Sequence, residues 1–138
     1  MKKLGLTLLL WLGLGGFAQA QTQCVVPANA AGTAVVSAAL EGSHVLKASP
    51  GCLLSVYMTI DNTTAGYLMV FNSTTVPSDG AVTPIECIYL SADPGSIGLN
   101  FAPQPPVWYS TGISVAFSST GCFTKTVSAH AFFHALVQ

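Results

Sequence analysis

Three histidines are the side chains of this 138-residue chain with the widest choice of chemistry, because an imidazole can bind a metal ion or act as a base. His130 and His134 are four residues apart, and on a helix this spacing would place both rings on one face at metal-ligand distance. The surrounding residues alternate as in a strand, where four residues span about 13 Å, too far for one ion. We therefore expect both histidines on one face of the last strand without a metal, and a helix there would reverse this expectation.

Nucleophilic catalysis needs a base beside the nucleophile and a third group that orients the base. None of the histidines has an evident acidic partner in the sequence, and the chain contains no Gly-x-Ser-x-Gly motif. Asp61, Asp79 and Asp93 lie in turn-forming segments, where an aspartate commonly caps backbone amides. The sequence thus predicts no catalytic residue and no cofactor, and it favours a protein that is not an enzyme.

Four cysteines are the other residues with defined chemistry, at positions Cys24, Cys52, Cys87 and Cys122. They are separated by 28, 35 and 35 positions, so no two form the closely spaced pair that is typical of a zinc site. An even number of cysteines in an exported chain predicts two disulfides, and three pairings are compatible with the sequence.

Trp108 and Tyr109 directly follow a proline-rich segment at residues 103–106. Together they could form an aromatic platform for a sugar or for a docking strand. Packing into the core is the more common fate of a lone tryptophan, and both interpretations are compatible with the sequence.

The N-terminus has the pattern of a secretory signal peptide. Lys2 and Lys3 precede an uncharged apolar run at residues 4–17, which is followed by small residues at Ala18 and Ala20. The apolar run is shorter than the roughly 20 residues that a membrane-spanning helix needs. We expect residues 1–20 to be cleaved, residues 21–31 to form an N-terminal arm, and residues 32–138 to form one domain in the periplasm or outside the cell.

Removal of the signal peptide would leave two lysines, no arginine and five acidic residues, a formal charge of −3. Affinity for nucleic acid depends on the number of cations that neutralise phosphates, and two lysines cannot form a basic patch. The same argument excludes binding to anionic lipid headgroups. We therefore expect no nucleic-acid partner and no stable membrane span after cleavage, and a surface with so little charge suits contact with other proteins.

The sequence patterns of the remaining segments predict strands. Residues 53–60 alternate, with Leu54, Val56, Met58 and Ile60 on one face, and residues 67–71 follow a turn-forming segment, which predicts a hairpin. Further strands are expected at residues 85–90, 97–101 and 111–118, and one or two more at 123–138. Residues 33–40 fit a strand or a short helix. This pattern predicts an all-β fold: a single antiparallel β-sandwich, jelly-roll-like or a small barrel, with about seven to nine strands.

Five short blocks follow one another in order: 66–72 (GYLMVFN), 77–85 (PSDGAVTPI), 110–113 (STGI), 123–126 (FTKT) and 135–138 (ALVQ). In these blocks residues 50–138 resemble small β-rich virion-associated proteins encoded by tailed bacteriophages. The resemblance implies a compact β fold that serves assembly or surface decoration, with no catalytic residues to carry over. The signal peptide and the cysteines would add export to that role.

We therefore expect an exported, non-enzymatic structural or interaction module that self-associates or decorates a surface or virion assembly. Residues 128–138 could pair with a strand of another chain if they form a sheet edge. The alternative is a secreted ligand- or glycan-binding module that uses Trp108 and Tyr109.

Overall fold

The computed structural model describes Cys24 and residues 31–61, 64–92, 96–100 and 106–138. The proposed signal peptide and all of the proposed arm except Cys24 and Ala31 lie outside the described residues, as does the turn that contains Asp93. The strands of the described residues lie within 33–137, and the described residues contain no helix. Consequently no helix in this part of the chain has the length and hydropathy to cross a bilayer.

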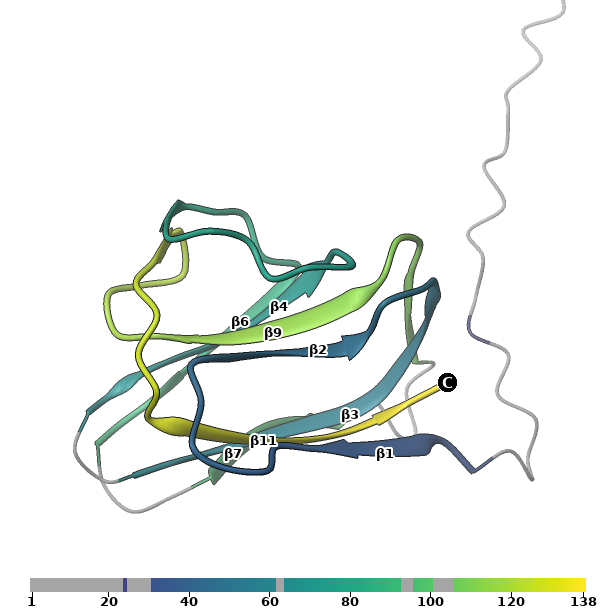
Figure 1. The fold of residues 1–138 in the computed structure, drawn as a ribbon, viewed down its shortest axis with the longest axis horizontal. Helices are drawn as coiled ribbons and strands as arrows, with labels where there is room; N and C mark the ends of the chain where they lie inside the picture. The colour runs from purple at the N-terminus through teal and green to yellow at the C-terminus, as the bar shows by residue number, and fades with distance from the viewer. Residues whose placement is uncertain (1–23, 25–30, 62–63, 93–95, 101–105) are drawn as a thin grey trace, which may run out of the picture.

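The strands form two antiparallel sheets that pack as two layers (Figure 1). Sheet A contains, in spatial order, β1 (Thr33–Val36), β11 (Ala131–Val137), β3 (Gly51–Ile60) and β7 (Ser96–Asn100), and β8 (Val107–Tyr109) also pairs with β3. Sheet B contains β2 (Ser43–Lys47), β9 (Ile113–Ser118), β4 (Gly66–Asn72) and β6 (Glu86–Leu90). A separate two-stranded ladder joins β5 (Gly80–Ala81) to β10 (Thr124–Lys125). The all-β sandwich is confirmed, with eleven strands in the described residues rather than seven to nine. The sequence pattern did not indicate β2, β5 and β8, and the last two are only two and three residues long.

The core lies between the two sheets. Apolar residues from the inner faces fill it, and its largest fully buried members include Leu53, Val56, Met58, Leu68, Ile113, Phe117 and Phe133. At about 25 cal/mol per Å² of apolar surface removed from water, this burial is the main stabilising contribution. Alternation along β3 places Val56, Met58 and Ile60 inward as predicted. Leu53 replaces Leu54 in the core, because the pairing of β3 with β11 shifts register between Leu136 and Val137.

The predicted hairpin of residues 53–60 and 67–71 is wrong. β3 belongs to sheet A and β4 to sheet B, so the chain between them passes from one layer to the other. The apolar run of β4 explains the error: Leu68 and Val70 point into the main core, while Met69 and Phe71 join a second cluster on the outer side of sheet B. A strand buried on both faces gives no alternation from which its partner can be predicted.

Two further expectations concern the chain ends. Thr33–Val36 is a strand, and the hydroxyl of the next residue, Ser37, accepts a hydrogen bond from the Phe133 amide at 2.9 Å. The C-terminal segment is not the sheet edge that pairing with another chain would require. β11 lies between β1 and β3, and strands of its own chain therefore pair with both of its sides.

Candidate functional site

All four cysteines are paired, as Cys24–Cys52 and Cys87–Cys122, with Cα–Cα distances of 5.8 Å in both bridges. The first bridge ties a residue of the N-terminal segment to β3, and the second ties β6 to the connection between β9 and β10. In the chain-entropy view, closing loops of these lengths stabilises the fold by roughly 3 to 4 kcal/mol each. The prediction of two disulfides is confirmed, and such bridges are consistent with an oxidising environment.

Trp108 and Tyr109 do not form a common platform. They are neighbours on β8, so their side chains point to opposite faces of sheet A, and Tyr109 is 1% exposed whereas Trp108 is 38% exposed. Burial raises the pKa of the Tyr109 hydroxyl, and the charge of Glu86 adds to this effect. Trp108 lies directly opposite Cys52. Tyr109 therefore packs in the core, whereas Trp108, the residue for which core packing was the more common fate, stays partly exposed.

Two histidines have carboxylate partners that the sequence did not reveal. His44 Nδ1 lies 2.8 Å from Glu41 Oε1, and His130 Nδ1 lies 2.6 Å from Asp61 Oδ2. The three-residue spacing between Glu41 and His44 is a signal that could have found the first pair. The second pair depends on the pairing of β3 with β11, which places Asp61 beside His130 across 69 residues of sequence.

The histidines of the C-terminal segment do not share one environment. His130 precedes β11, and its ring meets the buried Phe117 edge-on, with ring centroids 6.2 Å apart. His134 lies within β11 on the outer face of sheet A, beside Tyr57. The segment is a strand, as expected, but the prediction of one shared face is wrong because His130 turns toward the end of the core. Among the described residues no cluster of three or more histidines, cysteines or carboxylates could hold a metal.

The outer face of sheet A carries a row of residues that are directly paired across four strands. Val36 pairs with His134, His134 with Tyr57, and Tyr57 with Gly98. We call these four residues the Tyr57 row. Together with Thr59 and Phe132, three of its members line a shallow hollow of about 360 Å³. Residues directly opposite on antiparallel strands point to the same side, so this hollow is a property of the sheet face itself.

The outer face of sheet B is covered instead. Met69, Phe71 and Ala116 form a second buried cluster there, under Val76, Val82 and Cys87. In Figure 1 the loops that contain β5 and β10 rise above β4, β6 and β9 on this side. An ion pair between Lys125 and Asp79 holds the two loops together, and Asp79 also accepts a hydrogen bond from the Val127 amide at 3.2 Å. Asp79 thus joins two segments that are distant in sequence.

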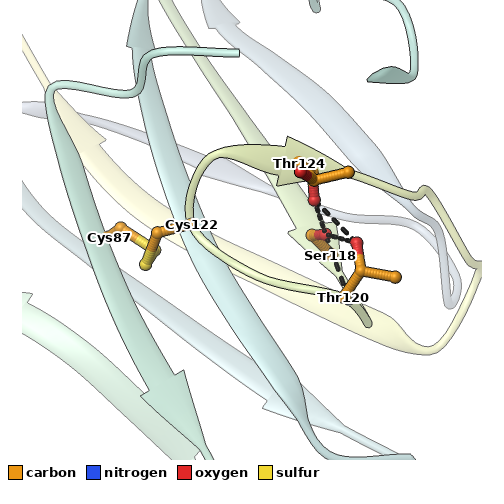
Figure 2. Close-up of a disulfide and its surroundings, with 5 residues drawn as sticks. All are labelled: Cys87, Ser118, Thr120, Cys122 and Thr124. Atoms are coloured by element: carbon orange, nitrogen blue, oxygen red, sulfur yellow. Dashed lines mark hydrogen bonds between the residues drawn. A yellow bond between two sulfur atoms is a disulfide. The ribbon is translucent and has the colours of Figure 1, made fainter. Parts of the chain in front are cut away.

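The connection between β9 and β10, residues 119–123, is fixed at its base, and we call it the Phe123 loop. Figure 2 shows the hydroxyl network of Ser118 and Thr120, which both donate hydrogen bonds to the Thr124 carbonyl, at 3.0 and 2.7 Å. The Cys87–Cys122 bridge lies beside this network in the same view. Phe123 follows Cys122 and is 71% exposed, the highest value among the large exposed hydrophobic residues of the described chain.

None of the protein-family models matches this chain, and searches of curated proteins and of solved structures found no significant match. The resemblance to bacteriophage virion proteins therefore stays a prediction. Two surface features of the molecule are candidates for a function, the Tyr57 row and the Phe123 loop.

Proposed function

We propose that this protein is an exported, non-enzymatic structural module that functions by contact with other proteins. It would do so by self-association or by decorating a larger surface or virion assembly, in the periplasm or outside the cell. The observation that carries the proposal is the Phe123 loop, in which a strongly exposed phenylalanine follows a disulfide-bonded cysteine. A few buried aromatic anchors supply most of the affinity of protein interfaces.

Preorganisation of the loop strengthens this argument. The bridge to Cys87 and the hydrogen bonds of Ser118 and Thr120 hold the backbone on both sides of Phe123. A side chain presented on such a backbone loses less conformational entropy on binding than one on an unrestrained loop. An interface that covers Phe123 would remove this exposed apolar surface from water, which favours association.

A second aromatic group lies near the same bridge. Tyr89 is 54% exposed, lies two residues from Cys87 along β6, and therefore points to the same face of the strand. Its ring packs against Tyr67 of β4 at a centroid distance of 5.2 Å. The disulfide thus brings exposed aromatic side chains from two separate segments into one region of the surface, which we call the Phe123 surface.

The charge distribution supports a protein partner. The side chain of Lys125 is buried against Asp79, so one of the two lysines outside the proposed signal peptide is already occupied within the fold. The proposed export rests on the signal-like N-terminus and on the disulfides. The virion-like role rests on the resemblance of residues 50–138.

The histidine–carboxylate pairs also have a structural explanation. Glu41 forms a two-way backbone bridge with Ala131, while Asp61 donates its backbone amide to the His130 carbonyl. Both pairs therefore lie where a connection meets the first residues of β11, and each side-chain contact reinforces a backbone contact. This arrangement supports a structural role for the two pairs, in which they hold the neighbouring connections against the start of β11.

Sedimentation velocity on the exported, oxidised protein tests the proposal. We expect reversible association that depends on concentration, with Phe123→Ser lowering the association constant at least about tenfold. The matched control is Leu40→Ser, which removes another exposed hydrophobic side chain from the β1–β2 connection and should leave association unchanged.

Fractionation of cultures that produce the protein tests whether it binds to a larger assembly. The protein should sediment with envelope or virus-like particles, and Phe123→Ser should release it into the soluble fraction while Leu40→Ser does not. A protein that is monomeric at every concentration and free of particles in every fraction would refute the proposed function.

A further inference from the structure

We propose that the hollow on the outer face of sheet A is a saccharide-binding site, in which a neutral sugar ring stacks on Tyr57 and His134. This site is separate from the Phe123 surface and does not depend on the proposed function. It also replaces the Trp108–Tyr109 platform that the sequence indicated, since Tyr109 is buried.

The orientation of the Tyr57 ring is the first observation. A Cβ atom placed on Gly98 would lie 2.2 Å from Cδ1 and 2.7 Å from Cε1 of Tyr57, so the ring rests on the bare backbone of Gly98. Any larger residue at position 98 would push the ring away from the sheet. Because Tyr57 contacts the neighbouring strand at Gly98 and is still 39% exposed, part of its side-chain surface remains open to a ligand.

His134 extends this aromatic surface. Its ring centroid is 6.5 Å from that of Tyr57, and the two ring planes are inclined by 29°. Direct pairing of β11 with β3 fixes the two backbone positions, and sites on strands are held more rigidly than sites on loops. The pair therefore places two stacked rings at the hollow in a fixed arrangement, without the entropy cost of ordering a loop when the ligand binds.

The chemistry of the lining selects the class of ligand. Val36, Phe132 and the Tyr57 ring are apolar, while the Thr59 hydroxyl and the His134 imidazole can exchange hydrogen bonds with a ligand. The lining contains no lysine, arginine, aspartate or glutamate, so nothing there compensates the desolvation of a phosphate, sulfate or carboxylate. The ligand that complements such a site is neutral, with an apolar face and polar edges.

A sugar ring has this character, because its C–H bonds form apolar faces and its hydroxyl groups lie around the rim. The hollow of about 360 Å³ falls at the small end of the range for ligand pockets, which suits one or two sugar rings. The hollow is shallow, so a bound ring would leave one side in water. A hydroxylated ligand tolerates this exposure, whereas a wholly apolar ligand would gain little from so incomplete a burial.

Binding of neutral oligosaccharides to the exported protein tests the proposal. The probes are arrayed oligomers of glucose, N-acetylglucosamine, galactose and mannose, with sulfated and uronic-acid oligomers as charged comparisons. Calorimetry then measures the affinity of each oligomer that binds. We expect binding within the neutral set, a loss of about tenfold or more for Tyr57→Ala, and unchanged affinity for the matched aromatic control Trp108→Ala.

A second pair of variants separates ring orientation from ring identity. Gly98→Ala retains every lining side chain but displaces the Tyr57 ring, so it should weaken binding about as much as Tyr57→Ala. Its Cβ would also lie 2.8 Å from the Val56 carbonyl oxygen, and thermal unfolding must therefore confirm that the variant folds. Thr59→Val replaces a hydroxyl of the lining with a methyl group and should weaken binding, which provides an independent test if Gly98→Ala does not fold.

Three results would overturn the proposal: no binding to any neutral oligomer, a preference for the charged oligomers, or a loss of affinity with Trp108→Ala but not with Tyr57→Ala. Dissociation of a dimer by Tyr57→Ala in sedimentation would also overturn it, because a second copy of the chain would then cover this face. None of the saccharide-binding results changes the expected effect of Phe123→Ser on association, so each proposal can be refuted without the other.

Discussion

The outer faces of the two sheets differ in what covers them. On sheet B the outward residues Ser114, Ala116 and Ser118 of β9 are fully buried beneath the loops that carry β5 and β10. On sheet A the outward residues Tyr57, Thr59 and His134 are exposed. The outer face of sheet B is therefore covered by the loops that contain β5 and β10, which we call the cover, and the Phe123 loop belongs to it. The outer face of sheet A is exposed and carries the Tyr57 row.

The difference also appears in the sequences of the strands. β4 is an almost continuous apolar run because both of its faces are buried, whereas β11 alternates between buried and more exposed residues. The covered side places contact residues on a restrained loop, and the open side places them on paired strands. The first arrangement suits a protruding anchor that enters a partner, and the second suits a flat ligand that lies on the surface.

The sharpest test of the comparison exchanges one phenylalanine on each outer face for alanine. Phe71→Ala removes a buried ring from the second cluster of sheet B and should lower the free energy of unfolding by about 3 to 5 kcal/mol. Phe132→Ala removes a partly exposed ring from the outer face of sheet A and should cost about 1 kcal/mol. Chemical denaturation of the oxidised protein measures both values. Equal costs would mean that the two faces are covered alike.

Removal of one disulfide at a time tests which bridge holds the cover of sheet B in place. Either double replacement, Cys87→Ala with Cys122→Ala or Cys24→Ala with Cys52→Ala, should lower the free energy of unfolding by roughly 3 to 4 kcal/mol, because the closed loops have similar lengths. Only the first should also speed amide exchange at residues beneath the cover, such as Ala116. Hydrogen exchange that is equally fast in both variants would contradict the assignment of Cys87–Cys122 to the cover.

The cover should also loosen in acid. The hydrogen bond from Lys125 lowers the pKa of Asp79, and the Val127 amide contributes in the same direction. A carboxylate whose pKa is depressed by folding stabilises the fold fully above its unfolded value of about 4, and this stabilisation is lost as the pH falls through the folded-state pKa. We expect the Val127 amide resonance to titrate below about pH 4 in the wild type. In Asp79→Asn this transition should disappear, and its persistence would assign it to another group.

Much of the fold was predictable from local pattern. Alternation gave most of the strands, and the cysteine count gave two disulfides in an all-β sandwich. Pairing between distant segments was not predictable, because β4 is buried on both faces and the turn after β3 has the same chemistry whether it closes a hairpin or crosses between sheets. The order of the strands depends on tertiary packing that no local window contains.

The candidate sites also depend on pairing between distant segments, which the sequence does not reveal. The outward position of Tyr57 followed from alternation, but its contact with His134 requires the register of β3 against β11, and the place of its ring requires Gly98 from a third strand. Trp108 and Tyr109 were noticed because they are adjacent in sequence. Successive side chains of a strand point to opposite faces of the sheet, so two adjacent residues cannot form one platform. The prediction of a shared platform was wrong for this reason.

The smallest expected effect concerns the backbone of the two loops that cover sheet B. Gly80 of β5 has a φ of +120°, a conformation that side chains disfavour, although a Cβ there would meet no atom within 4 Å. Gly80→Ala should therefore lower the free energy of unfolding by about 1 kcal/mol through backbone strain alone. Gly121 of the Phe123 loop has equally open space, so Gly121→Ala should stay within about 0.5 kcal/mol of the wild type. Denaturation midpoints of the two variants measure the difference, and a larger cost at Gly121 would show that the Phe123 loop, rather than β5, carries the strained turn of the cover.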